Sequence, residues 1–489
     1  MGYPLEAVLG MWSDGPGPLH RKLSDALRAA VDDGRIAAGQ RLPSERDLAT
    51  RLAVSRSTVV AAYDTLRAEG VLESRQGSGT RTRSRNGRRS GADPAVAAWP
   101  PFPVSPVYRT LIDVRDDVIS LACATFPAHP LVAEVIGEVI GPGGDKLLAH
   151  HGYLPAGLPA LREALADRLT DLGTPTSPDQ VLVTTGAQQA VNLAAQMLVR
   201  PGDEVVVESP SFSGTLDVIR TRGARVTVVP VDDGGVDVRG VARAVTEGEP
   251  ALVYLMPTFH NPTGALLAAN RRRDLAELVA ERGVPIVEDN ALENAPLDDE
   301  RLPPIAAYAP ANAPVLSAGS FSKAAWGGLR VGWMRGPAPL ISRMTELKAM
   351  NDLGSPLFDQ AIAARLVPHL DEMRDDHRVM LNRNLDLVSG LLAELLPSWT
   401  WRRPKGGPSL WVELPSGTAS AFTQVALRCG VEVIPGDQMS PTGDDHRKLR
   451  LPYSAEPPVL EETMRRLARA WEAYAPSDEA GSSFRPVVV

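Results

Sequence analysis

The stretch from residue 320 to residue 333 combines an amine, two hydroxyls and a guanidinium, a set of groups that suits a phosphorylated aldehyde. The primary amine of Lys323 can condense with an aldehyde to form a Schiff base. The hydroxyls of Ser320 and Ser322 and the fork of Arg330 can bind a phosphate through charge-assisted hydrogen bonds, each worth about 1.5–3 kcal/mol. The stretch therefore predicts a site that holds such a molecule covalently at one end and ionically at the other.

Lysine is scarce in this chain, which has six lysines among 51 basic residues. Most lysines in proteins are hydrated surface residues, but Lys323 is followed closely by Gly327 and Gly328. Because glycine has no side chain, this pair would let the backbone approach a bound group. The scarcity and the glycines favour a chemical role for Lys323.

The elements that must position this stretch belong to a large domain, which we expect at residues 117–477. Short β-branched runs alternate there with helical stretches, a pattern typical of an α/β domain built on a largely parallel sheet. The predicted strands are 181–184, 204–208, 226–231, 252–256, 285–288 and 315–318, and the predicted helices include 187–199 and 268–282. Ligands of such sheets bind at the C-terminal ends of the strands.

Four further groups fall at those predicted strand ends. A strand-to-helix joint at Gly186 presents backbone amides and a helix N-terminus to an anion. Phe212 could stack on a pyridine ring, although a core phenylalanine is the alternative, and Asn261 offers a donor to a ring hydroxylate. Asp289 ends a buried strand, where a carboxylate is costly unless it is paired. A protonated pyridine nitrogen would pair it, and an aspartate that caps a turn is the other interpretation.

Together these residues resemble the pattern of fold-type I pyridoxal 5'-phosphate (PLP) enzymes, the aminotransferase class, over nearly the whole large domain. The resemblance implies that Lys323 carries PLP as an aldimine, that Asp289 pairs with the pyridine nitrogen, and that Asn261 and Phe212 contact the ring. It implies a smaller C-terminal α+β subdomain as well. The phosphate would be held by Gly186, Ala187, Gln188, Ser320, Ser322 and Arg330.

The same resemblance implies binding roles for two more residues, and at one position the chain departs from the aminotransferase pattern. Arg450, in the stretch KLRLPYS, corresponds to the arginine that binds an amino acid α-carboxylate, and Tyr153 would reach the phosphate of a second subunit. Two residues after the pyridine-binding aspartate, aminotransferases usually carry a tyrosine that bonds the ring hydroxyl, whereas this chain has Ala291. Enzyme activity is therefore uncertain, and we expect at most a weak transaminase half-reaction.

The N-terminal segment shows a different pattern, that of a winged helix-turn-helix. Residues 18–33 have a helical period of apolar residues. Ser44 and Ser55 each stand where they can cap a following helix, and a tight turn separates those two helices. Residues 71–80 then predict a strand, a glycine-tipped turn and a returning strand, which make a wing.

These elements place polar side chains where a DNA-binding domain needs them. The front of the third helix is the end that a recognition helix presents to base edges in the major groove, and the wing suits phosphate and minor-groove contacts. The predicted contacts are Arg46, Ser55, Arg56, Ser57, Thr58, Arg75, Gly77 and Gly79. In order, this stretch resembles the DNA-binding domain of the GntR family over residues 10–83, which implies double-stranded promoter DNA as a partner.

Charge and composition agree with two functional parts. The first 90 residues hold 15 basic and 10 acidic residues, while the rest hold 36 basic and 49 acidic. A basic small end on an acidic body indicates a polyanion partner for the first part. Residues 84–116 are polar and proline-rich, which predicts a semi-rigid linker, with Tyr108 as one possible anchor on the large domain. We expect residues 478–489 to be a disordered tail.

The composition also indicates the cellular compartment in which the protein works. The chain has 489 residues, 44% hydrophobic and 22% charged, which are ordinary values for a globular protein of two to four domains. Cys123 and Cys429 show no metal-site spacing and no disulfide framework, so we expect two reduced thiols and no metal. With no long apolar run and no signal pattern, we expect a cytoplasmic protein with no membrane partner.

A GntR-like winged helix joined to an aminotransferase-like domain resembles the MocR/GabR family of bacterial transcription regulators. The resemblance implies a head-to-tail homodimer in which PLP, or PLP with an amino compound, changes how the DNA-binding domains are presented. Two other functions stay open. One is an aminotransferase with an inherited DNA-binding appendage, and the other is a sensor of PLP itself that controls vitamin B6 genes.

Overall fold

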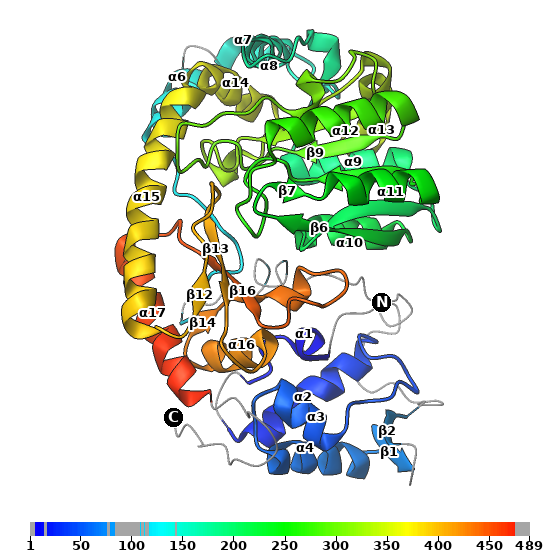
Figure 1. Cartoon of the computed structure of the whole chain (residues 1–489), viewed down its shortest axis with the longest axis vertical. Helices are drawn as coiled ribbons and strands as arrows, with labels where there is room; N and C mark the ends of the chain where they lie inside the picture. The colour runs from blue at the N-terminus through cyan, green and yellow to red at the C-terminus, as the bar shows by residue number, and fades with distance from the viewer. Residues whose placement is uncertain are drawn as a thin grey trace.

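The computed structural model describes residues 5–13, 17–75, 79–83, 108, 112, 117–141 and 144–474. The predicted linker lies outside these residues except at positions 108 and 112, and the predicted tail lies wholly outside them. Figure 1 shows the small N-terminal domain beneath a C-terminal subdomain, with the large α/β domain above both.

The N-terminal domain is a winged helix-turn-helix, as predicted. Its elements are α2 (Leu19–Asp32), α3 (Glu45–Arg51), α4 (Arg56–Ala68), β1 (Leu72–Arg75) and β2 (Gly79–Thr82), and the two strands pair antiparallel. Both predicted caps are confirmed, since Ser44 Oγ accepts from the backbone N–H of Asp47 and Ser55 Oγ from that of Thr58, each at 3.1 Å. Sequence reasoning missed α1 (Leu5–Leu9), which packs into the same apolar core.

The large domain is built on an eight-stranded sheet of order β4-β11-β10-β9-β8-β5-β6-β7. The strands are β4 (Val181–Thr184), β5 (Glu204–Ser209), β6 (Arg225–Asp232), β7 (Gly235–Val236), β8 (Leu252–Leu255), β9 (Ile286–Asp289), β10 (Val315–Ser320) and β11 (Gly332–Arg335). The six predicted strands are confirmed, and their pairing is mainly parallel. The unpredicted β11 runs antiparallel to both β4 and β10.

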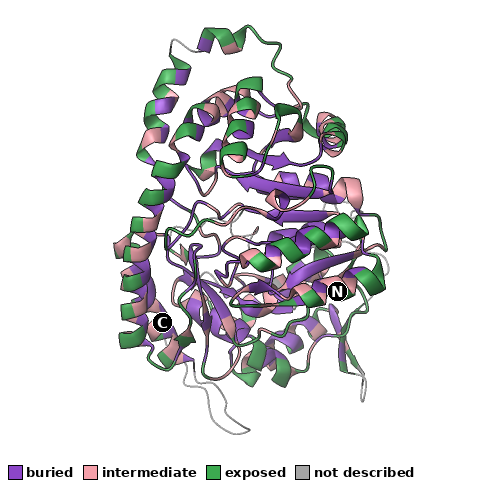
Figure 2. Ribbon diagram, turned by 45° about the horizontal axis from the view of Figure 1, so that its top comes forward, coloured by how far each residue is buried: buried purple, intermediate pink, exposed green. Residues whose placement is uncertain are grey.

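Helices cover both faces of this sheet, which explains why its central strands are continuously apolar. One face packs α9 (Ala187–Leu198), α10 (Ser213–Thr221) and α13 (Ala338–Asp352), and the other packs α11 (Val238–Gly248) and α12 (Ala269–Arg282). The end of the sheet at β4 and β11 is covered by α6 (Pro130–Ile140), α8 (Pro159–Asp171) and α14 (Leu357–Leu366), with α7 (Gly144–Leu148) beside α14. Figure 2 shows the strands as buried and the outer helices with exposed faces.

A long helix, α15 (Leu370–Leu395), leads into the predicted α+β subdomain. Its four-stranded sheet, ordered β12-β13-β16-β15, comprises β12 (Thr400–Trp401), β13 (Ser409–Glu413), β15 (Ile434–Pro435) and β16 (Lys448–Pro452). The helices α16 (Ala419–Arg428) and α17 (Pro457–Ala473) pack on it, and β14 (Val431–Glu432) pairs with β3 (Ile119–Ser120). Short 3₁₀ turns are η1 (Pro178–Gln180), η2 (Ile305–Ala307), η3 (Gly327–Leu329), η4 (Val367–His369) and η5 (Gly436–Gln438). Among the described helices, none has the length and apolar character needed to cross a bilayer.

Candidate cofactor site and DNA-binding surface

Lys323 lies in the turn between the neighbouring strands β10 and β11, so the sheet fixes both ends of the segment that carries it. The side chain is half-buried, and its amine donates a hydrogen bond to the backbone carbonyl of Ala124. Desolvation lowers the pKa of this amine to about 8, the nearby Cys123 raises it, and Arg450 and Arg330 lower it further. A neutral amine is the form that attacks an aldehyde, so the setting prepares Lys323 for that chemistry near neutral pH.

The lowered pKa predicts how PLP capture depends on pH. Because the pKa of Lys323 is about 8 rather than the ordinary 10.5, the fraction of neutral amine should rise up to about pH 8 and level off above it. We expect the rate at which the apo-protein attaches PLP to follow this curve in stopped-flow absorbance. A rate that keeps rising tenfold per pH unit well beyond pH 8 would show that Lys323 titrates like a hydrated lysine.

Asp289 ends β9 in the interior, with 4% of its surface exposed. The hydroxyl of Tyr254 donates to its Oδ2 at 2.8 Å, and the backbone N–H of Ala291 donates to its Oδ1 at 3.0 Å. Burial raises the pKa of Asp289, while these two hydrogen bonds lower it. Neither neighbour is a cation, so a protonated pyridine nitrogen fits as the charge partner. Sequence reasoning missed Tyr254, which holds the carboxylate.

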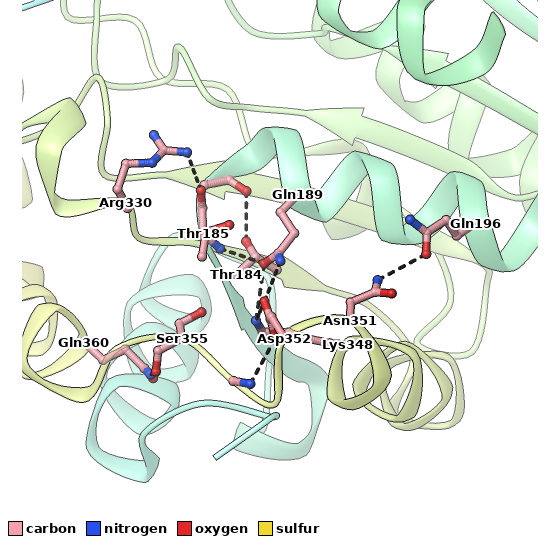
Figure 3. Close-up of polar contacts among 12 residues, drawn as sticks. Thr184, Thr185, Gln189, Gln196, Arg330, Lys348, Asn351, Asp352, Ser355 and Gln360 are labelled. Carbon is pink, nitrogen blue, oxygen red and sulfur yellow. Dashed lines mark hydrogen bonds and ion pairs between the residues drawn. The ribbon is translucent and has the colours of Figure 1, made fainter. Parts of the chain in front are cut away.

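Gly186 and Arg330 converge as the predicted phosphate seat requires. Gly186 begins α9 with φ 102°, and a Cβ placed there would lie 3.4 Å from Arg330 Nη2 and 3.8 Å from Ser320 Oγ. Arg330 is tied down by its Nη2, which donates to the carbonyl of Thr185 at 2.6 Å (Figure 3). The positive φ favours glycine at this position, and the backbone amides that open α9 lie close to a guanidinium and a hydroxyl, an arrangement that suits a phosphate.

Two of the predicted phosphate ligands have other partners. The amide of Gln188 donates to the carbonyl of Gly214 at 3.1 Å, and the backbone N–H of Ser322 donates to Ser320 Oγ at 3.1 Å. Beneath the seat, Asp352 Oδ2 accepts from Lys348 at 2.6 Å and from Gln189 at 2.7 Å (Figure 3). In this network Lys348 is buried and Asp352 is exposed, and the contacts join the start of α9 to the end of α13, which lie far apart in the sequence.

Phe212 stands at the start of α10 beside an aromatic residue from the linker. A Cβ on Gly214 would meet both the ring of Phe212 and the hydroxyl of Tyr108 at 2.6 Å, so the three groups are closely packed. Burial raises the pKa of Tyr108 to about 12, which keeps its hydroxyl protonated as a donor. Tyr108 was predicted only as a linker anchor, and the structure places it at the candidate site.

Arg450 lies buried on β16 and faces the same site from the subdomain. Its Nη2 donates to the carbonyl of Ala122 and its Nη1 to Asn261 Oδ1 at 3.4 Å, while its Nε has no hydrogen-bond partner among the described residues. Burial lowers the pKa of Arg450 to about 10 and raises that of Cys123. An incompletely bonded, buried guanidinium suits a carboxylate. Cys123, which interacts with both Arg450 and Lys323, was not predicted to be here.

The predicted DNA contacts on the third helix form an exposed edge. Ser55, Arg56 and Ser57 are exposed at the start of α4, and Arg46 is exposed on α3. The hydroxyl of Ser55 lies 2.8 Å from those of both Ser57 and Thr58. Because these three hydroxyls are engaged with one another, the guanidinium of Arg56 is the side chain best placed to read a base edge.

Fewer of the predicted DNA contacts on the wing lie within the described residues. The strand positions of Arg75 and Gly79 are as predicted, but Gly77 lies outside the described residues, as does the side chain of Arg75. A Cβ on Gly79 would lie 3.2 Å from the Nε of Arg41, so this arginine, which was not predicted, packs at the wing. It adds a positive charge where a phosphate contact is expected.

The fold and these groups define a winged-helix DNA-binding domain joined to a PLP-binding, aminotransferase-like body. Comparison with known families agrees: residues 19–81 match the gntR family of bacterial regulatory proteins, and residues 149–470 match aminotransferase class I and II. The chain belongs to the MocR family of GntR-type transcription regulators, whose aminotransferase-like domain takes PLP.

Individual relatives and solved structures match most of the chain. The chain is 31% identical over 456 residues to the uncharacterized HTH-type transcriptional regulator YisV of Bacillus subtilis, covering 89% of this chain and 92% of the relative. It is 30% identical to the probable rhizopine catabolism regulatory protein MocR of Rhizobium meliloti, covering 74% and 75%. Among solved structures, the α-aminoadipate aminotransferase LysN of Thermus thermophilus, complexed with N-(5'-phosphopyridoxyl)-L-leucine, matches with a TM-score of 0.67 and 28% identity over 75% of this chain and 94% of that one.

Proposed function

We propose that this regulator senses an amino compound at PLP bound to Lys323 and transmits the occupancy of that site to its DNA-binding domain. One observation carries the proposal: Lys323 of the large domain and Arg450 of the subdomain each donate to a backbone carbonyl of the segment 122–124. A ligand with an amine and a carboxylate could engage the PLP end and the arginine end together. PLP supplies an electrophilic carbon when bound, and the protein supplies the charge that selects the carboxylate.

Sensing needs the ligand to favour one conformation, because only a difference in affinity shifts an equilibrium. Arg450 is bonded to the carbonyl of Ala122 and to Asn261, and a carboxylate that captures this guanidinium would compete with those contacts. β16, which carries Arg450, is paired with β15, and β15 leads directly into η5. In η5, Asp437 accepts from Ser420 at the start of α16 at 2.5 Å. These contacts connect the candidate ligand site to α16.

α16 is also the element that contacts the helix-turn-helix (Figure 1). At its end, Arg428 donates to the carbonyl of Leu52 at 3.3 Å and to that of Ala53 at 2.9 Å, in the turn between α3 and α4. Earlier in α16, Gln424 accepts from the indole N–H of Trp12 at 3.0 Å. Ala53 packs into the apolar core of the subdomain. The orientation of the reading helix is therefore tied to the position of α16.

Removing the contact between Arg428 and the helix-turn-helix should uncouple ligand binding from DNA binding. In Arg428→Ala, two charge-assisted bonds are lost, each worth about 1.5–3 kcal/mol in a buried setting. We expect the ratio of operator affinities with and without the bound amino compound to fall toward one, measured by fluorescence anisotropy. The control is Arg465→Ala, an exposed arginine on α17 whose ion pairs among the described residues lie within its own helix. An unchanged ratio in Arg428→Ala would exclude this contact as the link.

The exposed surface near the phosphate seat supports the further proposal of a head-to-tail homodimer. Tyr153, Met350 and Leu353 are 62%, 78% and 55% exposed. A Cβ on Gly354 would lie 2.8 Å from the carbonyl oxygen of Leu154, so Tyr153 and Leu353 are close neighbours. Such an apolar group is typical of an interface, and it would bring Tyr153 of one subunit toward the site of the other. Sedimentation equilibrium measures this association. A regulator that binds promoter DNA acts where the chromosome lies, which supports the proposal that the protein works in the cytoplasm.

The proposal is tested by footprinting the DNA upstream of the gene with apo-protein, PLP-loaded protein, and PLP-loaded protein with a panel of amines. A footprint that changes only when an amine is added supports amino-compound sensing. A change with PLP alone would identify a PLP sensor, and steady conversion of amino donors at ordinary enzyme rates would identify an aminotransferase. Either result would replace the proposed function.

A further inference from the structure

A cavity of about 370 Å³ lies next to the candidate cofactor site but is lined by none of the predicted PLP contacts. Its walls come from the end of α8, the start of α15, the loop 300–304 and the loops that follow β8 and β9. The volume is within the range of small-molecule sites, about 300–1,000 Å³. The cavity is therefore large enough for an amino acid and is distinct from the space that Lys323 faces.

The cavity holds a buried cation that is not fully bonded. Arg374, 6% exposed, donates from Nη2 to the carbonyl of Glu300 at 3.0 Å, and its Nε has no partner among the described residues. Asp371 accepts from Arg168 at 2.8 Å and from Arg301 at 2.6 Å, and these bonds hold the pKa of Asp371 well below its usual range. Asp371 therefore offsets part of the charge of Arg168 and Arg301, and the exposed carboxylates of Asp171 and Glu300 also line the cavity, so the charge of its lining is mixed.

A carboxylate lines the same cavity. Glu293 is half-buried, and its side chain has no hydrogen bond and no ion pair among the residues that the structure describes. Burial raises the pKa of Glu293, while Arg168, Arg301 and Arg374 lower it. Glu293 and Arg374 both line the cavity. A small ligand in it can therefore meet a hydrogen-bond acceptor and a donor of opposite charge.

The other walls are apolar, carry amides or belong to the exposed residues Asp171 and Glu300. The apolar lining comprises Leu172, Phe259, Leu266, Leu302, Pro303 and Pro304. The amide of Asn290 also lines the cavity, and its Oδ1 accepts from the hydroxyl of Thr258 at 2.9 Å. The surface is therefore divided between charged groups of both signs and an apolar patch, which complements a small zwitterion with a hydrocarbon side chain.

We propose that this cavity is a second, non-covalent site for an amino acid, whose carboxylate binds Arg374 and whose ammonium group binds Glu293. The two partly bonded groups gain partners of opposite charge, which buried charges require. Asn290 follows Asp289 in the chain, and Thr258 belongs to the loop that leads to Asn261. Occupancy therefore acts on both loops that carry predicted PLP contacts, and it changes the visible absorbance of bound PLP without any exchange at Lys323.

The test separates the two sites chemically. Full-length protein loaded with PLP is reduced with borohydride, which turns the bond at Lys323 into a stable secondary amine that no ligand can displace. Binding of the common L-amino acids and of ω-amino acids is then measured one at a time, at millimolar concentration, by calorimetry. We expect at least one to bind, and we expect Glu293→Gln and Arg374→Gln to weaken it by about tenfold or more. Glu293→Gln keeps the shape of the side chain, so its fold should be preserved.

Two further variants serve as controls in the reduced background. Arg450→Gln should keep the binding, because Arg450 does not line the cavity, and so should Arg365→Gln, an exposed arginine on α14 that pairs with Glu138. Loss of binding in Arg450→Gln would place the ligand in the cofactor site and overturn the inference. Equal binding in both cavity variants and the parent, or no binding of any amino acid tried, would overturn it too. Failure to fix PLP by reduction would instead count against the proposed function.

Discussion

Lys323→Ala is expected to abolish covalent attachment of PLP and any response of DNA binding to amino compounds. No other lysine near the phosphate seat can substitute, because Lys348 is fully buried and bonded to Asp352. Borohydride treatment followed by peptide mass analysis should find a pyridoxyl group on Lys323 in the parent and no fixed pyridoxyl group in the variant. Removing an amine whose charged form is penalised by burial should leave the apo-protein folded.

The matched control is Lys405→Ala, which removes an exposed lysine at the edge of the subdomain. It should keep the label and the absorbance of bound PLP. Thermal unfolding of the apo-proteins checks that both variants are folded. A pyridoxyl group on a different lysine of the parent, or undiminished labelling of Lys323→Ala, would contradict the assignment of Lys323.

Local signals were sufficient to predict most of the fold. Ser44 and Ser55 each precede a helix that their side chains do cap, and the uninterrupted apolar runs of the central strands reflect burial on both faces. β11 was missed because its four residues, Gly332–Arg335, overlap the end of the Lys323 stretch and include a glycine, which weakens a strand signal. α1 was missed because five residues are too few to show a helical period.

The motif residues could be predicted because each comes directly before or after an element with a clear pattern. The groups that shift the pKa of these residues or hold them in place could not be predicted from the sequence. Cys123 and Tyr254 affect Lys323 and Asp289 through space, from segments far away in the chain, and neither has a local motif. The same holds for Arg428, whose partners are backbone carbonyls 375 and 376 residues away. Such contacts depend on how the domains pack, and sequence spacing carries no information about that.

Arg56→Ala and Arg46→Ala are expected to weaken DNA binding in two different ways. Arg56 is exposed at the front of α4, and a base contact there should be worth about 1–3 kcal/mol, or about 5- to 150-fold in affinity for the operator. Its loss should leave affinity for unrelated DNA much less affected. Arg46, on α3, is placed to contact phosphate, so its loss should weaken all sequences alike and reduce the salt dependence of binding by about one ion.

Titrations of operator and unrelated duplexes at several salt concentrations distinguish these outcomes. The slope of log affinity against log salt concentration reports the number of phosphate contacts. The ratio of operator affinity to affinity for unrelated DNA reports the contribution of base contacts. Arg21→Ala, an exposed change on α2 away from the predicted contacts, should leave both quantities unchanged. Equal weakening of operator and unrelated DNA by Arg56→Ala would show that Arg56 contacts phosphate. The hydroxyls of Ser55, Ser57 and Thr58 would then have to leave their mutual hydrogen bonds to read the bases, which would make recognition depend on rearrangement of the helix cap.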